Sequence, residues 1–251
     1  MPDTTKINFY LQPIYNSKKH CFSDLEVLAR FPMESGLETD VENSIAQAEQ
    51  DGSIAGIDLA ALKFACDKFP ELKKYGIESI HVNLSPVTCA VPSLGRQIKQ
   101  ILDQTDTDPQ NICIELTESN FSGNLAALLA VADMLIQFRF QLALDDVGKG
   151  ESDFERIIHL PISHMKLDKS MAFHLDFNER IPRLISSLVQ FTDASGMTIT
   201  AEGVENAEVA EKLIALGCHY LQGYYFSKPL SYEQLLSWLS YHDLASPCFQ
   251  H

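Results

Sequence analysis

The sequence predicts a (β/α)8 barrel of the TIM type in which the first strand runs antiparallel to its neighbours. Eight strand-like segments alternate with helical segments over 251 residues, a length at which such barrels form one domain. The first two strand segments are joined by too few residues for a parallel crossover. Phosphate-loop and dinucleotide-binding fingerprints are absent, which weighs against the alternative of an open doubly wound sheet. We therefore expect a single domain over residues 1–251.

The elements follow in a regular order after an opening hairpin. Strands are predicted at residues 7–15 and 22–31, and the short link over residues 16–21 favours antiparallel pairing. The later strands are expected at 79–85, 112–116, 142–146, 164–168, 198–202 and 219–225. Helices are expected near 41–50, 57–74, 93–104, 123–138, 152–159 and 180–195. A closing helix should begin at Ser231, because Ser231 and Gln234 have the spacing of a capping box.

Composition and charge limit the classes of function. Hydrophobic residues make up 45% of the chain and charged residues 21%, as in a globular protein with a large core. The formal net charge of -15 has the wrong sign for general attraction to a nucleic-acid backbone, so we expect neither DNA nor RNA as a partner. The six cysteines lack Cys-x-x-Cys spacing, and the sequence has no signal peptide or membrane-length apolar run. The chain is therefore expected to be cytoplasmic, with no membrane partner.

Two adjacent carboxylates end one of the most apolar strands. Asp145 and Asp146 follow the apolar residues 142–144 and precede Gly148. Ionised carboxylates that leave a buried strand repel each other and are costly to desolvate, so a cation such as a hard divalent metal is one expected partner. A turn with both side chains in water is the alternative that this stretch alone leaves open.

Polar side chains occur near the C-terminal ends of nearly all the predicted strands. They are Glu26, Asn83, Glu115, Asp145, Asp146, Lys166, Glu202 and Gln222. Since the active site of such a barrel lies at this end, we expect these side chains to converge at its mouth. Carboxylate and amide oxygens favour Mg²⁺ or Mn²⁺, and their number suggests two ions and hydrolysis of a phosphoester. Lys166 could then orient a water or hold a phosphate oxygen, and Glu202 could accept a hydrogen bond from the nucleophile.

The order of these motifs resembles that of the EAL domain family. The resemblance covers residues 7–230 and rests on seven motifs: Glu26-Val27-Leu28, Val82-Asn83-Leu84-Ser85, Glu115-Leu116-Thr117-Glu118, Asp145-Asp146-Val147-Gly148, Lys166-Leu167-Asp168, Ala201-Glu202-Gly203-Val204-Glu205 and Gln222-Gly223-Tyr224. It implies a cyclic di-GMP phosphodiesterase that opens the cyclic dinucleotide to linear pGpG with Mg²⁺ or Mn²⁺. It also allows a homodimer.

The same resemblance implies a role for each site residue. Glu26, Asn83, Glu115 and Asp145 would hold one metal ion, and Asp145 with Asp146 the second. Lys166, Glu202 and Gln222 would serve the attacking water and its surroundings, and Gln12 and Arg30 would contact the substrate. Glu118 matches the residue that anchors the loop after Asp146, and Glu205 is a further acid of the mouth.

Two stretches depart from the family pattern. The signature triplet reads Glu-Val-Leu instead of Glu-Ala-Leu, which keeps the metal-binding carboxylate. The loop over residues 147–154 differs more, with Val147 in place of phenylalanine, a charge at Lys149 and a further charge at Glu151. The loss of aromatic area predicts a looser loop, and Lys149 lies within reach of the carboxylate pair. We expect a weaker second metal site.

Two other functions are compatible with the same barrel. A degenerate EAL domain would bind cyclic di-GMP, or only a protein partner, without hydrolysis. An unrelated barrel aldolase would use Lys166 as a Schiff-base lysine, but the surrounding carboxylates would raise its pKa and make the free amine scarce. His81 and His164 are interpreted as packed or solvent-facing histidines and not as metal ligands.

Overall fold

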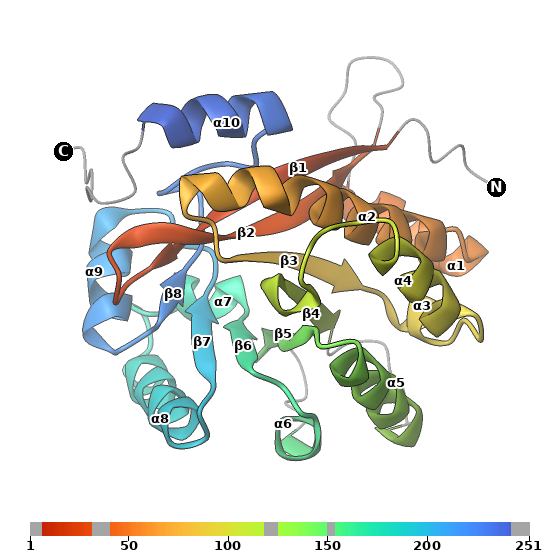
Figure 1. The fold of residues 1–251 in the computed structure, drawn as a ribbon. Coiled ribbons are helices and arrows are strands. Elements are labelled where there is room, and N and C mark those ends of the chain that lie inside the picture. Colours follow the sequence, from red (N-terminus) through yellow and green to blue (C-terminus); the bar gives the residue numbers. More distant parts are fainter. Residues whose placement is uncertain (1–6, 32–40, 118–124, 150–153, 242–251) are drawn as a thin grey trace.

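Eight strands close into a barrel that is ringed by helices (Figure 1). The computed structural model describes residues 7–31, 41–117, 125–149 and 154–241. The strands follow one another around the barrel in sequence order, from β1 to β8. The predicted fold class is therefore confirmed.

The first strand runs against both of its neighbours, as the short first link requires. The strands are β1 (Asn8–Asn16), β2 (Cys21–Arg30), β3 (Ser79–Leu84), β4 (Ile112–Thr117), β5 (Gln141–Val147), β6 (His164–Leu167), β7 (Thr198–Ala201) and β8 (Tyr220–Leu221). β1 pairs antiparallel with β2 and with β8, and the other neighbouring pairs are parallel. Parallel pairing gathers the C-terminal ends of β2 to β8 at one mouth.

Most helices begin and end close to their predicted positions. These are α1 (Val41–Asp51), α2 (Ile54–Leu72), α4 (Leu94–Leu102), α5 (Leu125–Gln137), α6 (Phe154–His159), α8 (Arg180–Ala194) and α10 (Tyr232–Tyr241). The capping box is confirmed, since the Ser231 backbone N–H donates to Gln234 Oε1 and the Gln234 backbone N–H donates to Ser231 Oγ. The prediction missed α3 (Pro86–Cys89), α7 (Lys169–Phe173) and α9 (Ala207–Ala215). The start of α9 carries an N-cap signal, because Asn206 Oδ1 accepts a hydrogen bond from the Val209 backbone N–H.

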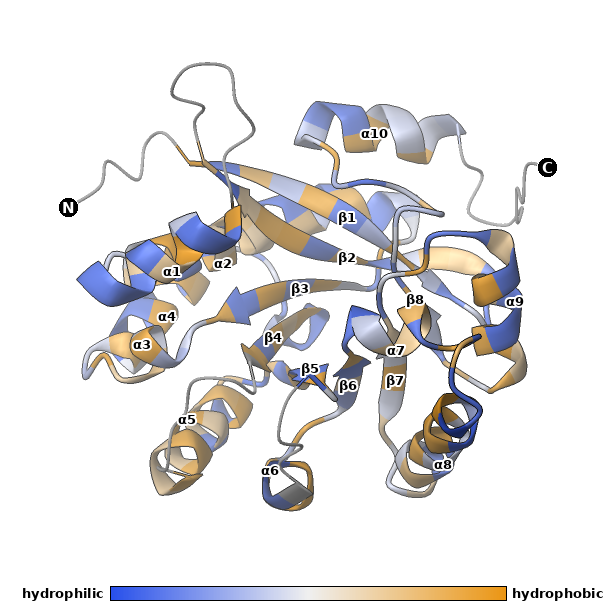
Figure 2. Ribbon diagram, turned by 180° about the vertical axis from the view of Figure 1, so that it is seen from behind, coloured by the Kyte–Doolittle hydropathy of each residue, from blue (hydrophilic) through white to orange (hydrophobic). Residues whose placement is uncertain are grey.

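The core lies between the strands and the helices, and the inside of the barrel is polar. Figure 2 shows hydrophobic residues along the strands and on the helices that surround them. The outward-facing strand residues are fully buried: Leu25, Ile80, Ile112, Leu142, Met165 and Ile199. Alternate positions on the same strands point inward, and Glu26, His81, Glu115 and Lys166 are buried there. Because side chains alternate along each strand, the outward residues form the core and the inward residues form the candidate site.

The last strand is much shorter than predicted. β8 ends at Leu221, so the predicted strand over residues 219–225 was wrong for Gln222 onward. The chain leaves the sheet here because Gly223 lies against the backbone of Val204. A Cβ atom on Gly223 would come within 2.1 Å of the Val204 carbonyl oxygen. This close approach holds Gln222 at the mouth without a further strand pair.

Candidate active site

A single lysine lies among four carboxylates inside the barrel mouth. Nζ of Lys166 is 2.7 Å from Glu202 Oε1 and 2.8 Å from Glu115 Oε2. It is 3.2 Å from Glu26 Oε2 and 3.6 Å from Asp145 Oδ1. Three of the carboxylates lie on β2, β4 and β5 and the fourth directly follows β7, so closure of the barrel brings together residues far apart in sequence. The fold therefore brings these side chains together, as predicted.

Two amide side chains complete this cluster. Asn83 Nδ2 donates to Glu26 Oε1 over 2.9 Å, and Gln222 Nε2 donates to Glu26 Oε2 over 2.6 Å. Gln222 also donates to Gln12 Oε1 over 3.1 Å, and Gln12 donates to the Ser227 carbonyl oxygen over 3.0 Å. Both oxygens of Glu26 are thus held by amide donors, and the chain of amides continues across the mouth to β1.

Burial and neighbouring charges shift the pKa values within the cluster in different directions. Burial opposes ionisation of Glu115, but the Lys166 ammonium and the His81 hydrogen bond outweigh it and lower the pKa of Glu115 to about 2. Burial raises the pKa of Glu202 to about 7 and that of Asp145 well above its usual value. For Lys166, burial favours the neutral amine, but the carboxylates prevail and raise its pKa. A charged ammonium is a poor Schiff-base nucleophile, which argues against the aldolase alternative.

The Asp145–Asp146 pair does not form a solvated turn. The Asp145 side chain is largely buried, and its Oδ1 atom makes no hydrogen bond to any residue that the structure describes. Asp146 has a left-handed backbone with φ of 60°, and Gly148 follows with φ of 97°. Nζ of Lys149 is 2.9 Å from Asp146 Oδ2, which confirms that Lys149 reaches the carboxylate pair.

Removing this local cation should make the second metal position that the family resemblance implies easier to fill. We expect Lys149→Thr to tighten the weaker of two Mn²⁺ binding steps by about two- to fivefold, the scale of an exposed ion pair. Calorimetric titration with Mn²⁺ would measure it. Lys63→Thr is the matched control, because Lys63 forms a similarly exposed pair with Asp67 on α2. An unchanged second step in Lys149→Thr would show that the ammonium does not compete with the metal.

The mouth opens into a cavity that holds half of the predicted site residues. Its walls include Gln12, Glu26, Asp145, Glu202, Glu205 and Gln222. Glu205 is exposed at its rim, as expected for a further acid of the mouth. Lys169 and Tyr224 also line this cavity and were not predicted as site residues. Glu118, the predicted loop anchor, lies outside the described residues, as do residues 150–153 of the altered loop.

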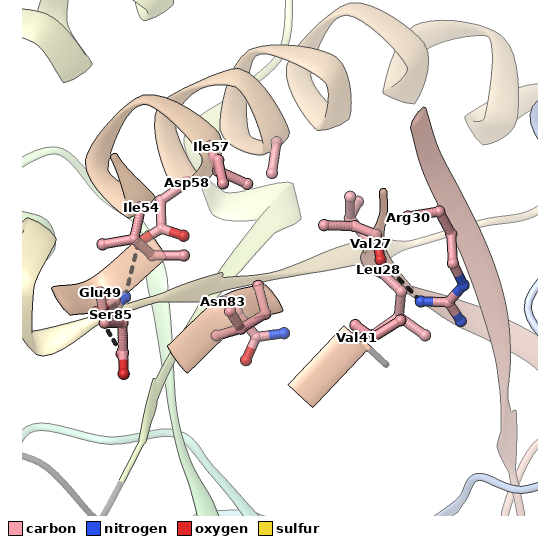
Figure 3. Close-up of a pocket in the computed structure, with 13 residues that line it drawn as sticks. Val27, Leu28, Arg30, Val41, Glu49, Ile54, Ile57, Asp58, Asn83 and Ser85 are labelled. Atoms are coloured by element: carbon pink, nitrogen blue, oxygen red, sulfur yellow. Dashed lines mark hydrogen bonds between the residues drawn. The ribbon is translucent and has the colours of Figure 1, made fainter. Parts of the chain in front are cut away.

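Arg30 lies in a second cavity, beside the carboxylate cluster. This cavity of about 240 Å³ is lined by the end of β2, by α1 and α2, and by Asn83 and Ser85 (Figure 3). Arg30 Nη1 donates to the Ala29 carbonyl oxygen over 2.9 Å, and the guanidinium lies 5.7 Å from the centre of the Tyr10 ring. The cation therefore stands at the edge of an apolar hollow that adjoins Asn83.

A buried acid on α2 closes the far side of the second cavity. Asp58 Oδ2 accepts from the Ser85 backbone N–H over 2.8 Å and from Thr88 Oγ1 over 2.5 Å. Ser85 Oγ in turn donates to Glu49 Oε1 over 2.7 Å. Burial raises the pKa of Asp58 to about 7, with a contribution from Glu49, although both hydrogen bonds oppose the shift. No motif in the sequence singles out this acid.

This buried acid predicts a pH-dependent stability. The folded-state pKa of Asp58 lies above the unfolded value of 3.8, so its contribution to stability is largest below pH 3.8 and falls as pH rises through about 7. We expect Asp58→Asn to match the wild type near pH 4 and to exceed it at pH 8 by about 3 to 4 kcal/mol. Urea unfolding at both pH values would measure the difference. A constant offset between the two proteins would contradict the assigned pKa.

The cluster has the donor chemistry of a hard cation site. Within the described part of the chain, no group of three or more His, Cys, Asp or Glu side chains forms a ready-made set of metal ligands. The Lys166 ammonium lies among the four carboxylates and contacts each of them, and His81 contacts Glu115 as well. Four carboxylates face one ammonium, and a buried oxygen of Asp145 lacks a hydrogen bond. Oxygen donors with excess negative charge fit Mg²⁺ or Mn²⁺.

Fold and cluster together define a barrel protein with an acidic, oxygen-rich site at the mouth. A family model of the EAL domain matches residues 3–229, and the chain therefore belongs to the EAL domain family. It is 26% identical over 230 residues to the cyclic di-GMP phosphodiesterase PdeL of Escherichia coli, covering 91% of this chain and 64% of PdeL. It is 31% identical over 161 residues to the cyclic di-GMP phosphodiesterase RocR of Pseudomonas aeruginosa, covering 63% of this chain and 40% of RocR.

A solved structure with the same fold is that of the PaMucR phosphodiesterase in complex with c-di-GMP. The TM-score is 0.84 and the identity 26%, over 92% of this chain and 94% of that one. The chain spans less than two thirds of the length of PdeL or RocR. Among the described helices, none combines the length and the apolar character needed to cross a membrane.

Proposed function

We propose that this protein hydrolyses cyclic di-GMP to linear pGpG with Mg²⁺ or Mn²⁺ at the barrel mouth. The observation that carries the proposal is the Lys166 cluster, in which four carboxylates from different parts of the barrel wall lie within 3.6 Å of one ammonium. Membership of the EAL domain family and the similarity to cyclic di-GMP phosphodiesterases support this substrate. The residue set that the family resemblance implies is present here, with Asn83 and Gln222 bound to Glu26.

Each residue of the cluster has a role in this reaction. Divalent cations, held by Glu26, Asn83, Glu115 and Asp145 and, for a second ion, by Asp145 with Asp146, would lower the pKa of a bound water and offset the phosphate charge. The water gives up a proton as its oxygen forms a bond to phosphorus, the bond from phosphorus to the 3′-oxygen breaks, and that oxygen takes up a proton. Glu202 lies beside the Lys166 ammonium and can accept a hydrogen bond from the water.

The substrate is held by groups around this centre. Lys166 and Arg30 supply positive charge to phosphate oxygens, and Gln12 with Gln222 offers amide groups at the mouth. Glu205 lies at the rim of the same cavity. We also propose that the chain folds as one domain, acts in the cytoplasm, pairs as a homodimer and binds no DNA or RNA. Light scattering during gel filtration would determine whether it is a dimer.

One assay tests the proposed reaction. Purified protein is incubated with cyclic di-GMP and Mn²⁺, and the nucleotides are separated by chromatography. We expect conversion to pGpG with Mn²⁺ and none in EDTA. Intact cyclic di-GMP after prolonged incubation with Mn²⁺ and with Mg²⁺ would rule out hydrolysis.

The acidic mouth predicts that substrate binding depends on metal. The net charge of -15 and the carboxylate cluster oppose the phosphates of the ligand until cations are bound. We expect cyclic di-GMP to bind at least about tenfold more tightly in Ca²⁺ than in EDTA. Titration calorimetry in the two buffers would measure both affinities. Equal affinities would mean that Arg30 and neighbouring contacts dominate recognition.

Binding without hydrolysis is the second candidate function. It is favoured by the ion pair between Lys149 and Asp146, because this carboxylate is proposed to hold the second cation. A protein of this kind would bind cyclic di-GMP in Ca²⁺ and leave it intact in Mn²⁺. The chromatographic assay and the binding titration together separate the two functions.

A further inference from the structure

A histidine lies directly beneath the carboxylate cluster inside the barrel. His81 projects from β3 two residues before Asn83, and its side chain is buried. Its Nδ1 atom is 2.8 Å from Glu115 Oε1, and its Nε2 atom is 3.8 Å from Asp24 Oδ1. An ionised carboxylate only accepts hydrogen bonds, so Nδ1 of His81 carries a hydrogen and donates it to Glu115.

This contact fixes the orientation of Glu115. One oxygen of the carboxylate, Oε1, accepts from His81 below, and the other, Oε2, accepts from Lys166 above over 2.8 Å. Glu115 is fully buried, so no solvent is available to replace either donor. Rotation of the carboxylate would break both hydrogen bonds at once. The imidazole therefore holds Oε2 toward the mouth, where the proposed metal would bind.

We propose that His81 is a positioning residue that sets the metal affinity of the site through Glu115. The inference rests on the proposed function only in its use of a divalent metal. A donor behind a metal ligand orients it, and removing such a donor typically costs about 10- to 100-fold in metal affinity or activity. His81 is thus more than a packed histidine, although it is not itself a ligand.

A neighbouring histidine offers a matched control. The ring of His164 lies 5.7 Å from that of His81, within the same polar interior. Its hydrogen bonds go elsewhere: Nε2 bonds with Gln141 Oε1 over 2.8 Å, and Nδ1 bonds with the Thr198 hydroxyl. Substitution of His164 therefore disturbs the barrel interior to a similar extent without removing a donor from Glu115.

The test compares two amide variants of His81. In a rotamer that follows the imidazole, the asparagine amide nitrogen replaces Nδ1, and the glutamine amide nitrogen replaces Nε2. Metal-free proteins are titrated with Mn²⁺ by calorimetry, without nucleotide. We expect His81→Gln to weaken Mn²⁺ binding by about 10- to 100-fold. His81→Asn should stay within about threefold of the wild type, and His164→Gln should bind Mn²⁺ unchanged.

Three results would overturn the inference. They are equal Mn²⁺ affinities for His81→Gln and His81→Asn, an equal loss in His164→Gln and His81→Gln, and a wild-type protein that takes up no Mn²⁺. If His81→Gln does not fold, His81→Asn decides alone, since a tenfold loss there would contradict the role of the Nδ1 donor. A wild-type protein that binds Mn²⁺ yet leaves cyclic di-GMP intact would refute the proposed function and leave this comparison valid.

Discussion

Asp145→Asn is expected to abolish hydrolysis of cyclic di-GMP and, at the same time, to stabilise the metal-free protein. Asp145 is largely buried, and its Oδ1 atom lacks a hydrogen bond within the described structure. Burial raises the pKa of this carboxyl group, and the nearby carboxylates add to the shift, although Lys166 opposes it. The neutral amide removes this repulsion, which we expect to add about 1 to 2 kcal/mol to the free energy of unfolding at pH 8.

The same substitution removes a proposed ligand of both metal ions. Loss of one preorganised charged group at a reacting centre lowers turnover by about 10²- to 10³-fold, and we expect at least that. Chromatography of the nucleotides with Mn²⁺ and urea unfolding in EDTA give the two readouts. Asp103→Asn is the control, because Asp103 forms an exposed pair with Lys99 and should change neither. Wild-type turnover in Asp145→Asn would refute the ligand assignment, and a drop in stability would refute the charge argument.

Much of the site could be predicted because strand periodicity and barrel closure act together. An apolar residue at Met165 followed by Lys166 and Leu167 predicts that Lys166 points away from the helices. In a closed barrel, every inward residue near a strand end must face the same small space. The pattern on each strand therefore predicts contacts such as that between Lys166 and Glu26, 140 positions apart in sequence.

Other features depend on details that the sequence pattern does not carry. β8 is short because Gly223 meets the Val204 backbone, a contact between two loops with no periodic pattern. The donor from His81 to Glu115 depends on the register of β3 against β4, which pairs Asn83 with Glu115. Asp58 was overlooked because an acid near the start of a helix usually faces solvent, whereas here it caps the start of α3 from inside.

Lys166→Met is expected to inactivate the protein and to lower its stability in EDTA by about 3 to 5 kcal/mol, the cost of breaking a buried ion pair from one side. The ammonium lowers the pKa of Glu115 to about 2 against the effect of burial, with help from His81. Without it, Glu115 and Glu26 would lose their contact with a buried cation, and the pKa of Glu115 would rise.

The pH dependence distinguishes this loss of charge from a simple loss of packing. In the wild type, the lowered pKa of Glu115 gives stability that is present above its unfolded value of 4.5 and is lost as pH falls toward about 2. In Lys166→Met, burial is expected to raise the folded-state pKa of Glu115 above its unfolded value, so we expect stability to fall as pH rises from about 4.5 to 8. Lowering the pH to 5, or adding Mn²⁺, should restore much of the lost stability.

Urea unfolding of Lys166→Met at pH 5 and pH 8, in EDTA and in Mn²⁺, would measure these effects. Lys99→Met is the control, because it breaks the exposed pair between Lys99 and Asp103 and should change the free energy of unfolding by less than about 1 kcal/mol. A Lys166→Met protein as stable as the wild type at pH 8 in EDTA would show that the carboxylates are not held together by this ammonium. An equal loss in the free energy of unfolding at both pH values would instead indicate lost packing of the methylene groups of Lys166.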